Sequence, residues 1–148
     1  WNRLLVIKES NNMVNFSDEP RSESVVYFEQ ILDSHVKIVR YEKLEDFVYN
    51  LFLNSGKTYL VWLTNKYTVS INDIVEKINE NFDALVTISE WNDYTYEAKE
   101  YALKNHFGLF KSREFMGALN YPDPSQYYTG IDEEDGKRMY GEHRYKFD

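Results

Sequence analysis

The sequence contains no cysteine, only three prolines and no long apolar run. Without cysteine the chain can form no disulfide bond, thiolate metal site or cysteine nucleophile. No run approaches the roughly 20 apolar residues of a membrane span, and no basic start leads into an apolar centre as in a signal peptide. We therefore expect a cytoplasmic protein without a membrane partner. The chain starts at Trp1, which leaves open whether further residues precede it.

Basic residues are also scarce, because 17 lysines and arginines face 25 aspartates and glutamates and the formal net charge is −8. Binding to phosphates needs clustered lysine and arginine, and long-range repulsion from a negative body weakens it. The composition therefore disfavours direct nucleic-acid binding, although a local basic patch would still permit it. Aromatic residues are abundant instead, at 17% of the chain with 13 tyrosines.

Short apolar runs alternate with helix-periodic segments along most of the chain. A length of 148 residues with 43% hydrophobic residues is typical of one domain with a buried core. The expected strands are 3–8, 36–41, 59–64, 84–89 and 108–111, and the expected helices are 22–33, 44–52, 71–82, one after a cap at Asp93 or Thr95, and 113–119. This alternation predicts an α/β fold, a three-layer sandwich with a mostly parallel sheet of about five strands.

Two helix signals are the most specific. Apolar residues from Leu44 to Phe52 follow the i, i+3, i+4, i+7 spacing of one helical face, and Gly56 fits a left-handed residue after its end. Ser70 and Asp73 have the spacing of a capping box, which predicts that the next helix begins there.

The residues after Leu119 differ from the preceding ones. The segment Tyr121–Pro124 predicts a helix end and an extended linker, and seven acidic residues face four basic ones from 120 to 148. We divide the chain into an α/β domain, 1–119, and an acidic, aromatic-rich, extended C-terminal arm, 120–148. Disordered segments are poor in aromatic residues, so we expect the arm to dock on this domain, on a protein partner or on a second copy. Its docking anchors are Tyr121, Tyr127, Tyr128, Tyr140, Tyr145 and Phe147.

The loops that follow the predicted strands hold the candidate ligand site. Ligands of parallel α/β sheets bind beyond the carboxyl ends of the strands, where these loops meet. The segment Glu90–Asp93 is the richest, with two carboxylates, an amide and an indole, although a helix-entry loop capped by Asp93 is the simpler explanation. The candidate ligand-binding residues are Asn65, Tyr67, Glu90, Trp91 and Asp93.

Motifs with self-contained chemistry are missing. No glycine lies between the first predicted strand and Gly56, which excludes a glycine-rich phosphate loop after that strand. His35, His106 and His143 lack the i, i+4 spacing of a helical zinc pair, and no Gly-x-Ser-x-Gly elbow occurs. We therefore assign no catalytic residue, no metal ligand and no cofactor from the sequence.

Four segments within Thr58–Leu119, about two fifths of the chain, carry a family resemblance. They read TYLVWLTNKYTVSINDIVEKI, ALVTISEW, TYEAKEYALKNH and GLFKSREFMGAL. In this order, the four segments are expected to form a strand and a helix, a strand close to "vvT", a helix with "eA...A", and a short strand with a small helix. This series of elements is similar to the C-terminal half of the Mrr-type restriction endonuclease-like family.

This resemblance implies a nuclease fold in which an Asp on one strand and an acidic-x-Lys on the next hold Mg²⁺ for phosphodiester cleavage. The strand Leu60–Thr64, where acidic-x-Lys is expected, contains neither a carboxylate nor a lysine. The literal Glu-x-Lys of the region, Glu97–Lys99, has a helical pattern instead. The chain therefore looks like a catalytically inactive relative of these nucleases.

Three functions remain open on this basis. The preferred one is a non-catalytic interaction module, a degenerate nuclease-like domain in a nucleic-acid-processing assembly, which docks partners through the arm and the Trp91 loop. The alternative is a small-ligand or nucleotide-binding α/β regulatory domain that uses the strand-end loops. The third is a metal-dependent nuclease with migrated carboxylates such as Glu90 and Asp93.

Overall fold

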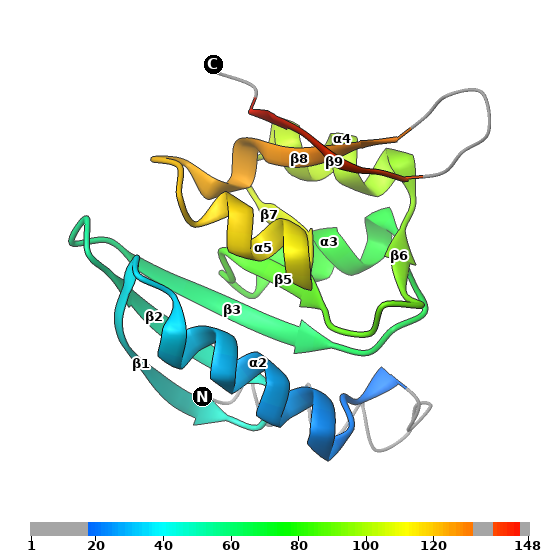
Figure 1. The fold of residues 1–148 in the computed structure, drawn as a ribbon. Helices are drawn as coiled ribbons and strands as arrows, with labels where there is room; N and C mark the ends of the chain where they lie inside the picture. Colours follow the sequence, from blue (N-terminus) through cyan, green and yellow to red (C-terminus); the bar gives the residue numbers. More distant parts are fainter. Residues whose placement is uncertain (1–17, 132–137, 146–148) are drawn as a thin grey trace.

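The computed structural model describes residues 18–131 and 138–145, and its centre is a five-stranded sheet with the strand order β1-β2-β3-β5-β7 (Figure 1). The strands are β1 (Ile38–Glu45), β2 (Val48–Leu53), β3 (Thr58–Thr64), β5 (Ala84–Thr87) and β7 (Gly108–Lys111). The pairs β1–β2 and β2–β3 are antiparallel, whereas β3–β5 and β5–β7 are parallel. The sheet is therefore mixed, and it is parallel only in the half that the later strands form.

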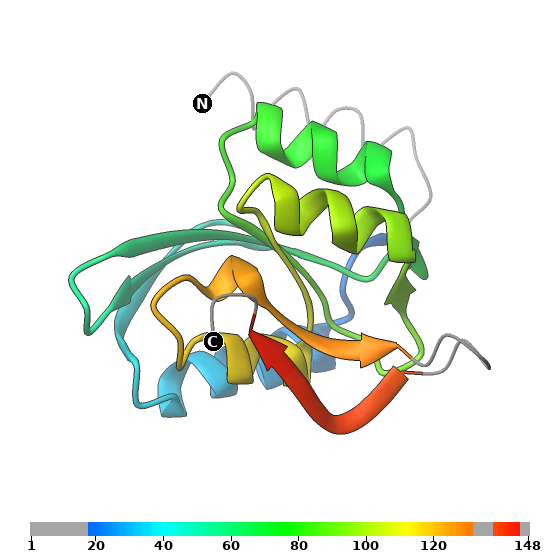
Figure 2. The same ribbon diagram turned by 90° about the horizontal axis from the view of Figure 1, so that it is seen from above.

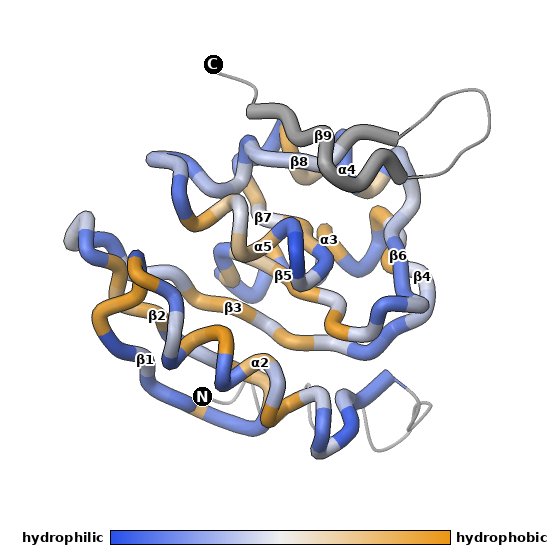
Figure 3. The backbone as a smooth tube through the Cα atoms, viewed as in Figure 1, coloured by the Kyte–Doolittle hydropathy of each residue, from blue (hydrophilic) through white to orange (hydrophobic). Residues whose placement is uncertain are grey.

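The α-helices of the described residues lie on both faces of this sheet (Figure 2). They are α2 (Ser22–Ser34), α3 (Ile71–Asn79), α4 (Tyr96–Lys104) and α5 (Ser112–Ala118). One buried apolar cluster joins Phe28 of α2 and Phe115 of α5 to the strands. The other joins Ile74 of α3 and Ala98 of α4 to the opposite face of the same strands. Both faces of the sheet are thus covered by helices, and hydrophobic residues are frequent along the central strands β3 and β5 (Figure 3).

The helix expected over 44–52 is wrong, because these residues form the hairpin of β1 and β2. The side chains of Tyr49 and Leu51 enter one apolar cluster and that of Val48 enters the other. A strand that is buried on both faces loses its alternating pattern, so its apolar spacing can imitate a helix. Phe47 occupies the tight turn with φ of 69°, a conformation that usually calls for glycine or asparagine.

Most of the other expected elements are confirmed in position. The strand expected over 3–8 lies outside the described residues, and β2 brings the central sheet to five strands. Ser70 and Asp73 form the expected capping box at the start of α3. Thr95 rather than Asp93 caps α4, because its side chain accepts a hydrogen bond from the backbone N–H of Ala98.

The segment expected to be an extended arm begins with a packed turn and a hairpin. The 3-10 helix η2 (Pro124–Gln126) leads into β8 (Tyr127–Ile131), which pairs antiparallel with β9 (Arg138–Tyr145). Tyr127 is only 7% exposed and belongs to the apolar cluster of α2 and α5. The backbones of Tyr140 and Tyr145 lie in β9, and Phe147 lies outside the described residues.

Two short strands, β4 (Thr68–Val69) and β6 (Asp93–Tyr94), pair parallel beside the main sheet. They join the segment after β3 to the segment after β5, close to the carboxyl ends of both strands. Among the described residues, no helix has both the length and the hydropathy that crossing a membrane requires.

Candidate functional site

A surface cleft of about 750 Å³ lies at the carboxyl ends of β5 and β7. Its walls come from the loop after β5, from the start of α5 and from the first two turns of α2, through Ile88, Ser89, Glu90, Trp91, Lys111, Ser112, Arg113, Glu23, Ser24 and Tyr27. A second hollow of about 490 Å³ shares four of these residues and extends to Arg21, Asn65 and Asn92. We call the two hollows together the strand-end cleft.

In the loop after β5, Trp91 is exposed to solvent, whereas the next residue, Asn92, is fixed by a hydrogen bond to Asn65. Asn92 is 4% exposed, and its side-chain amide donates to Asn65 Oδ1 at 3.0 Å, which ties the loop to the end of β3. The Ser89 carbonyl accepts from the backbone N–H of Asn92 at 3.1 Å and closes a turn. Trp91, inside that turn, is 84% exposed. The indole of Trp91 therefore lies in solvent, on a loop whose backbone is fixed by these hydrogen bonds.

Positive charge gathers around this cleft although the whole chain carries −8. Lys111 is 8% exposed, and its ammonium donates to the Glu90 carbonyl at 3.1 Å. Arg21 and Arg113 are exposed, and no ion pair joins either one to another described residue. These three cations face two carboxylates, Glu23 and Glu90, in the lining of the cleft.

The structure brings three of the five predicted ligand residues together, namely Asn65, Glu90 and Trp91. Tyr67 and Asp93 do not line the cleft, because they join the neighbouring short strands, where the backbone N–H of Asp93 donates to the Tyr67 carbonyl at 2.9 Å. Asp93 Oδ1 accepts from the backbone N–H of Tyr94 at 2.8 Å.

Sequence reasoning missed the contribution of α2 to the cleft. Glu23 and Tyr27 are one helical turn apart and line the same wall. Their spacing in the sequence identifies a shared helix face, but only the packing of α2 against the sheet puts that face beside the loop after β5. The basic residues Lys111 and Arg113 were also absent from the candidate ligand residues, although they lie at the end of β7 and in the first turn of α5.

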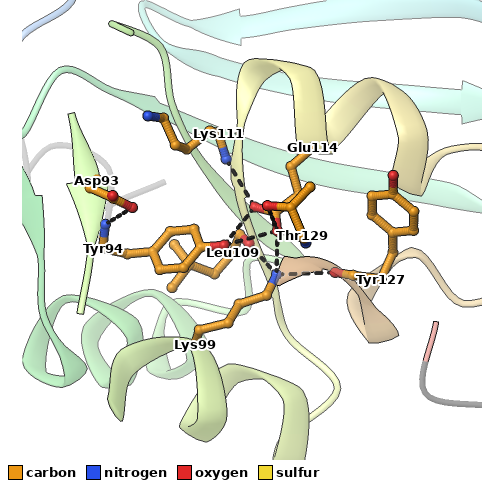
Figure 4. A network of polar contacts seen from close by, with 8 residues as sticks. All are labelled: Asp93, Tyr94, Lys99, Leu109, Lys111, Glu114, Tyr127 and Thr129. Atoms are coloured by element: carbon orange, nitrogen blue, oxygen red, sulfur yellow. Dashed lines mark hydrogen bonds and ion pairs between the residues drawn. The ribbon is translucent and has the colours of Figure 1, made fainter. Parts of the chain in front are cut away.

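A second polar cluster, around Glu114 and Lys99, is enclosed in the protein (Figure 4). The Glu114 carboxylate is 2% exposed and accepts from the Tyr94 hydroxyl at 2.8 Å and from the backbone N–H of Thr129 at 2.8 Å. The Lys99 ammonium lies 3.6 Å from this carboxylate and donates to the carbonyls of Leu109 at 2.6 Å and Tyr127 at 3.1 Å. The cluster links α4, β7, α5 and β8, so we interpret it as structural.

The end of β3, where the nuclease resemblance implies a metal site, is occupied by an ordinary ion pair. Lys66 Nζ lies 2.8 Å from Asp73 Oδ1, at the start of α3. Among the residues whose side chains the structure describes, no three histidines, aspartates or glutamates converge as a set of metal ligands. Comparison of the chain with protein-family models, curated proteins and solved structures finds no match.

Proposed function

We propose that this chain is a non-catalytic binding domain and that the strand-end cleft is its binding site. The observation that carries the proposal is the 84% exposure of Trp91 on a loop that Asn92 anchors. A tryptophan held out on a fixed backbone beside a hollow gains apolar contact when a ligand or partner covers it. The volume of about 750 Å³ falls in the range of about 300–1,000 Å³ that is usual for small-molecule sites.

A degenerate nuclease-like ancestry is part of this proposal. The order β3, α3, β5, α4, β7, α5 is the order that the family resemblance implies, and we read the helices on both faces as the three-layer sandwich of that family. The absence of a carboxylate from Leu60–Thr64 supports loss of cleavage. A role inside a nucleic-acid-processing assembly follows from this resemblance alone.

Docking of a protein partner or a second copy through the C-terminal segment is the weaker candidate. Tyr121 and Tyr127 stack with ring centroids 5.3 Å apart, and Tyr127 is buried in the core of its own chain. The Tyr127 ring is therefore not offered to a partner, and the Tyr121 ring is partly covered. The nuclease with migrated carboxylates gains no support, because Glu90 lines the cleft and Asp93 does not.

A ligand screen on the full chain tests the proposal. A library of metabolites and nucleotides is screened by thermal shift, and hits are mapped by the part of the tryptophan fluorescence quenching that is lost in Trp91→Ala. We expect at least one hit whose binding is lost in Trp91→Ala and kept in Tyr67→Ala, since Tyr67 is also exposed, at 72%, but lies outside the cleft. Nuclease assays with Mg²⁺ and Mn²⁺ run in parallel. Metal-dependent cleavage that disappears in Glu90→Gln would show that the domain is an enzyme after all.

A further inference from the structure

We propose that the strand-end cleft binds a small aromatic compound that carries a single phosphate group, as a nucleoside monophosphate does. This inference rests on the proposed binding function and adds the chemical class of the ligand. Two features of the cleft decide that class: the aromatic rings of one part of its wall and the cationic side chains of another.

The aromatic part of the wall consists of Trp91 and Tyr27, which belong to the loop after β5 and to α2. The two residues are 84% and 44% exposed, although both line the same hollow. Aromatic rings that stay solvated on the wall of a cleft favour a planar ring as ligand, because stacking covers their apolar faces. Any nucleobase offers such a face, whereas an aliphatic compound does not.

The cationic part of the wall consists of Lys111 and Arg113, with Arg21 in the adjoining hollow. The Lys111 ammonium is held in place by its 3.1 Å hydrogen bond to the Glu90 carbonyl. Arg113 and Arg21 form no ion pair with a described residue. Their guanidinium groups can therefore bind an incoming anion through bidentate hydrogen bonds. With three cations against two carboxylates, the lining of the cleft carries a local charge of +1 on a chain of net charge −8, which favours an anion at this place.

The start of α2 adds to this attraction. Arg21 is the N-cap residue of this helix of 13 residues, and its side chain makes no capping hydrogen bond. Glu23 and Ser24, in the first turn, line both hollows. The first backbone N–H groups and the positive end of the helix dipole therefore lie at the cleft, where they favour an anion together with the arginines.

The two carboxylates of the cleft limit the size of the anion. Glu23 and Glu90 lie among the same lining residues as the cations. A polyanion such as a nucleic-acid strand would have to pass these carboxylates, and the negative remainder of the chain would repel it. A ligand with one phosphate, which the arginines bind while its ring stacks, avoids the repulsion by these carboxylates and by the rest of the chain. A small molecule is therefore favoured over a nucleic acid.

Isothermal titration of the full chain tests this inference with three probes: adenosine monophosphate, adenosine and inorganic phosphate. We expect adenosine monophosphate to bind at least about tenfold more tightly than either fragment, because it engages both parts of the wall. Trp91→Ala should weaken the binding of adenosine monophosphate and the binding of adenosine about tenfold each. Arg113→Gln should weaken the binding of adenosine monophosphate about tenfold and leave the binding of adenosine unchanged.

Two exposed residues outside the cleft serve as matched controls, Tyr67→Ala for the ring and Lys104→Gln for the charge. Both should leave all affinities unchanged. The inference is overturned if adenosine monophosphate does not bind at about 10 mM, if it binds no better than adenosine, or if a short single-stranded oligonucleotide binds more tightly. A screening hit that depends on Trp91, together with failure of adenosine monophosphate, would remove this ligand class and keep the binding function.

Discussion

The ring of Tyr127 lies directly over Gly117, so closely that a Cβ atom at Gly117 would stand 2.5 Å from the tyrosine hydroxyl oxygen and 2.7 Å from Cζ. Gly117 is in α5 and Tyr127 begins β8, so this contact fixes the C-terminal hairpin on the body of the protein. Tyr127 also stacks on Tyr121. A glycine in a helix thus makes room for a core residue from a distant segment.

Replacement of this glycine by alanine should destabilise the protein. In an exposed helix Gly→Ala stabilises by about 1 kcal/mol, but here the new methyl group displaces the Tyr127 ring, at a cost of about 1–3 kcal/mol. Urea unfolding should therefore show a lower free energy of unfolding for Gly117→Ala. In a Tyr127→Ala background the same change should cost less. Stabilisation by Gly117→Ala alone would contradict the packing described.

Truncation after Asn120 should unfold the domain rather than remove an accessory arm. It deletes Tyr127 and also Gln126, which is 1% exposed and whose side-chain amide donates to the Leu103 carbonyl at 2.9 Å. Loss of a buried aromatic side chain alone costs about 3–5 kcal/mol. Circular dichroism on heating should show no cooperative transition for this chain. A chain that ends after Ile131 keeps both residues and should unfold cooperatively.

The enclosed pair of Lys99 and Glu114 should contribute more to stability than a surface ion pair. Lys99→Met leaves the Glu114 carboxylate buried and removes the donor to two carbonyls, so we expect a loss of about 3–5 kcal/mol in urea unfolding. The double variant with Glu114→Gln should lose less than the sum of the single changes. Lys66→Met, which breaks the more exposed pair with Asp73, should cost less than about 1 kcal/mol.

Replacement of Tyr59 by phenylalanine should raise stability by about 1 kcal/mol. The hydroxyl of Tyr59 is buried and has no hydrogen-bond partner among the described residues, and burial raises the pKa of this phenol well above its ordinary value. Removal of an unsatisfied polar group relieves its cost of desolvation. Tyr49→Phe is the control, because the Tyr49 hydroxyl donates to Glu29 at 2.7 Å and its loss should lower stability. Equal losses in both variants would argue against an unsatisfied hydroxyl.

The contact between Asp123 and His106 should make part of the stability depend on pH. Burial raises the pKa of Asp123, but hydrogen bonds from Ser125 and from His106, 2.8 Å away, outweigh it and hold this pKa below its ordinary value. The folded state therefore gains stability above the unfolded pKa of about 3.9 and loses it as the pH falls through the lower folded value.

Urea unfolding between about pH 5 and pH 2 measures this contribution of Asp123. The free energy of unfolding should fall more steeply with decreasing pH in the natural chain than in Asp123→Asn, since the amide does not titrate. Parallel curves for the two chains would mean that the carboxylate has the same pKa folded and unfolded.

In the hairpin of β1 and β2, the apolar spacing of the sequence predicted a helix where the structure has two strands. The spacing from Leu44 to Phe52 matches one helical face, yet the chain reverses at Phe47 with φ of 69°. No glycine, asparagine or proline marks this turn at the residue with positive φ. The left-handed conformation of Gly56 was expected and is confirmed with φ of 91°, but it serves the turn between β2 and β3 instead of a helix end.

The candidate site was foreseeable in part. Asn65, Glu90 and Trp91 follow the carboxyl ends of β3 and β5, and parallel neighbours bring those ends together. Tyr27 and Arg21 could not be found in this way, since α2 precedes the sheet and its position depends on the packing of Phe28 against the strands.

The sequence by itself determined the elements whose signals are local: the strands β3, β5 and β7, the capping box of α3 and the presence of a loop around Trp91. Tertiary structure alone decided the antiparallel start of the sheet, the burial of Tyr127 and the meeting of α2 with the strand ends. The physical reason is that a cap or a β-prone run lowers the free energy through neighbouring residues. Which face of a helix is buried, and beside which loop, depends on contacts between residues far apart in the chain.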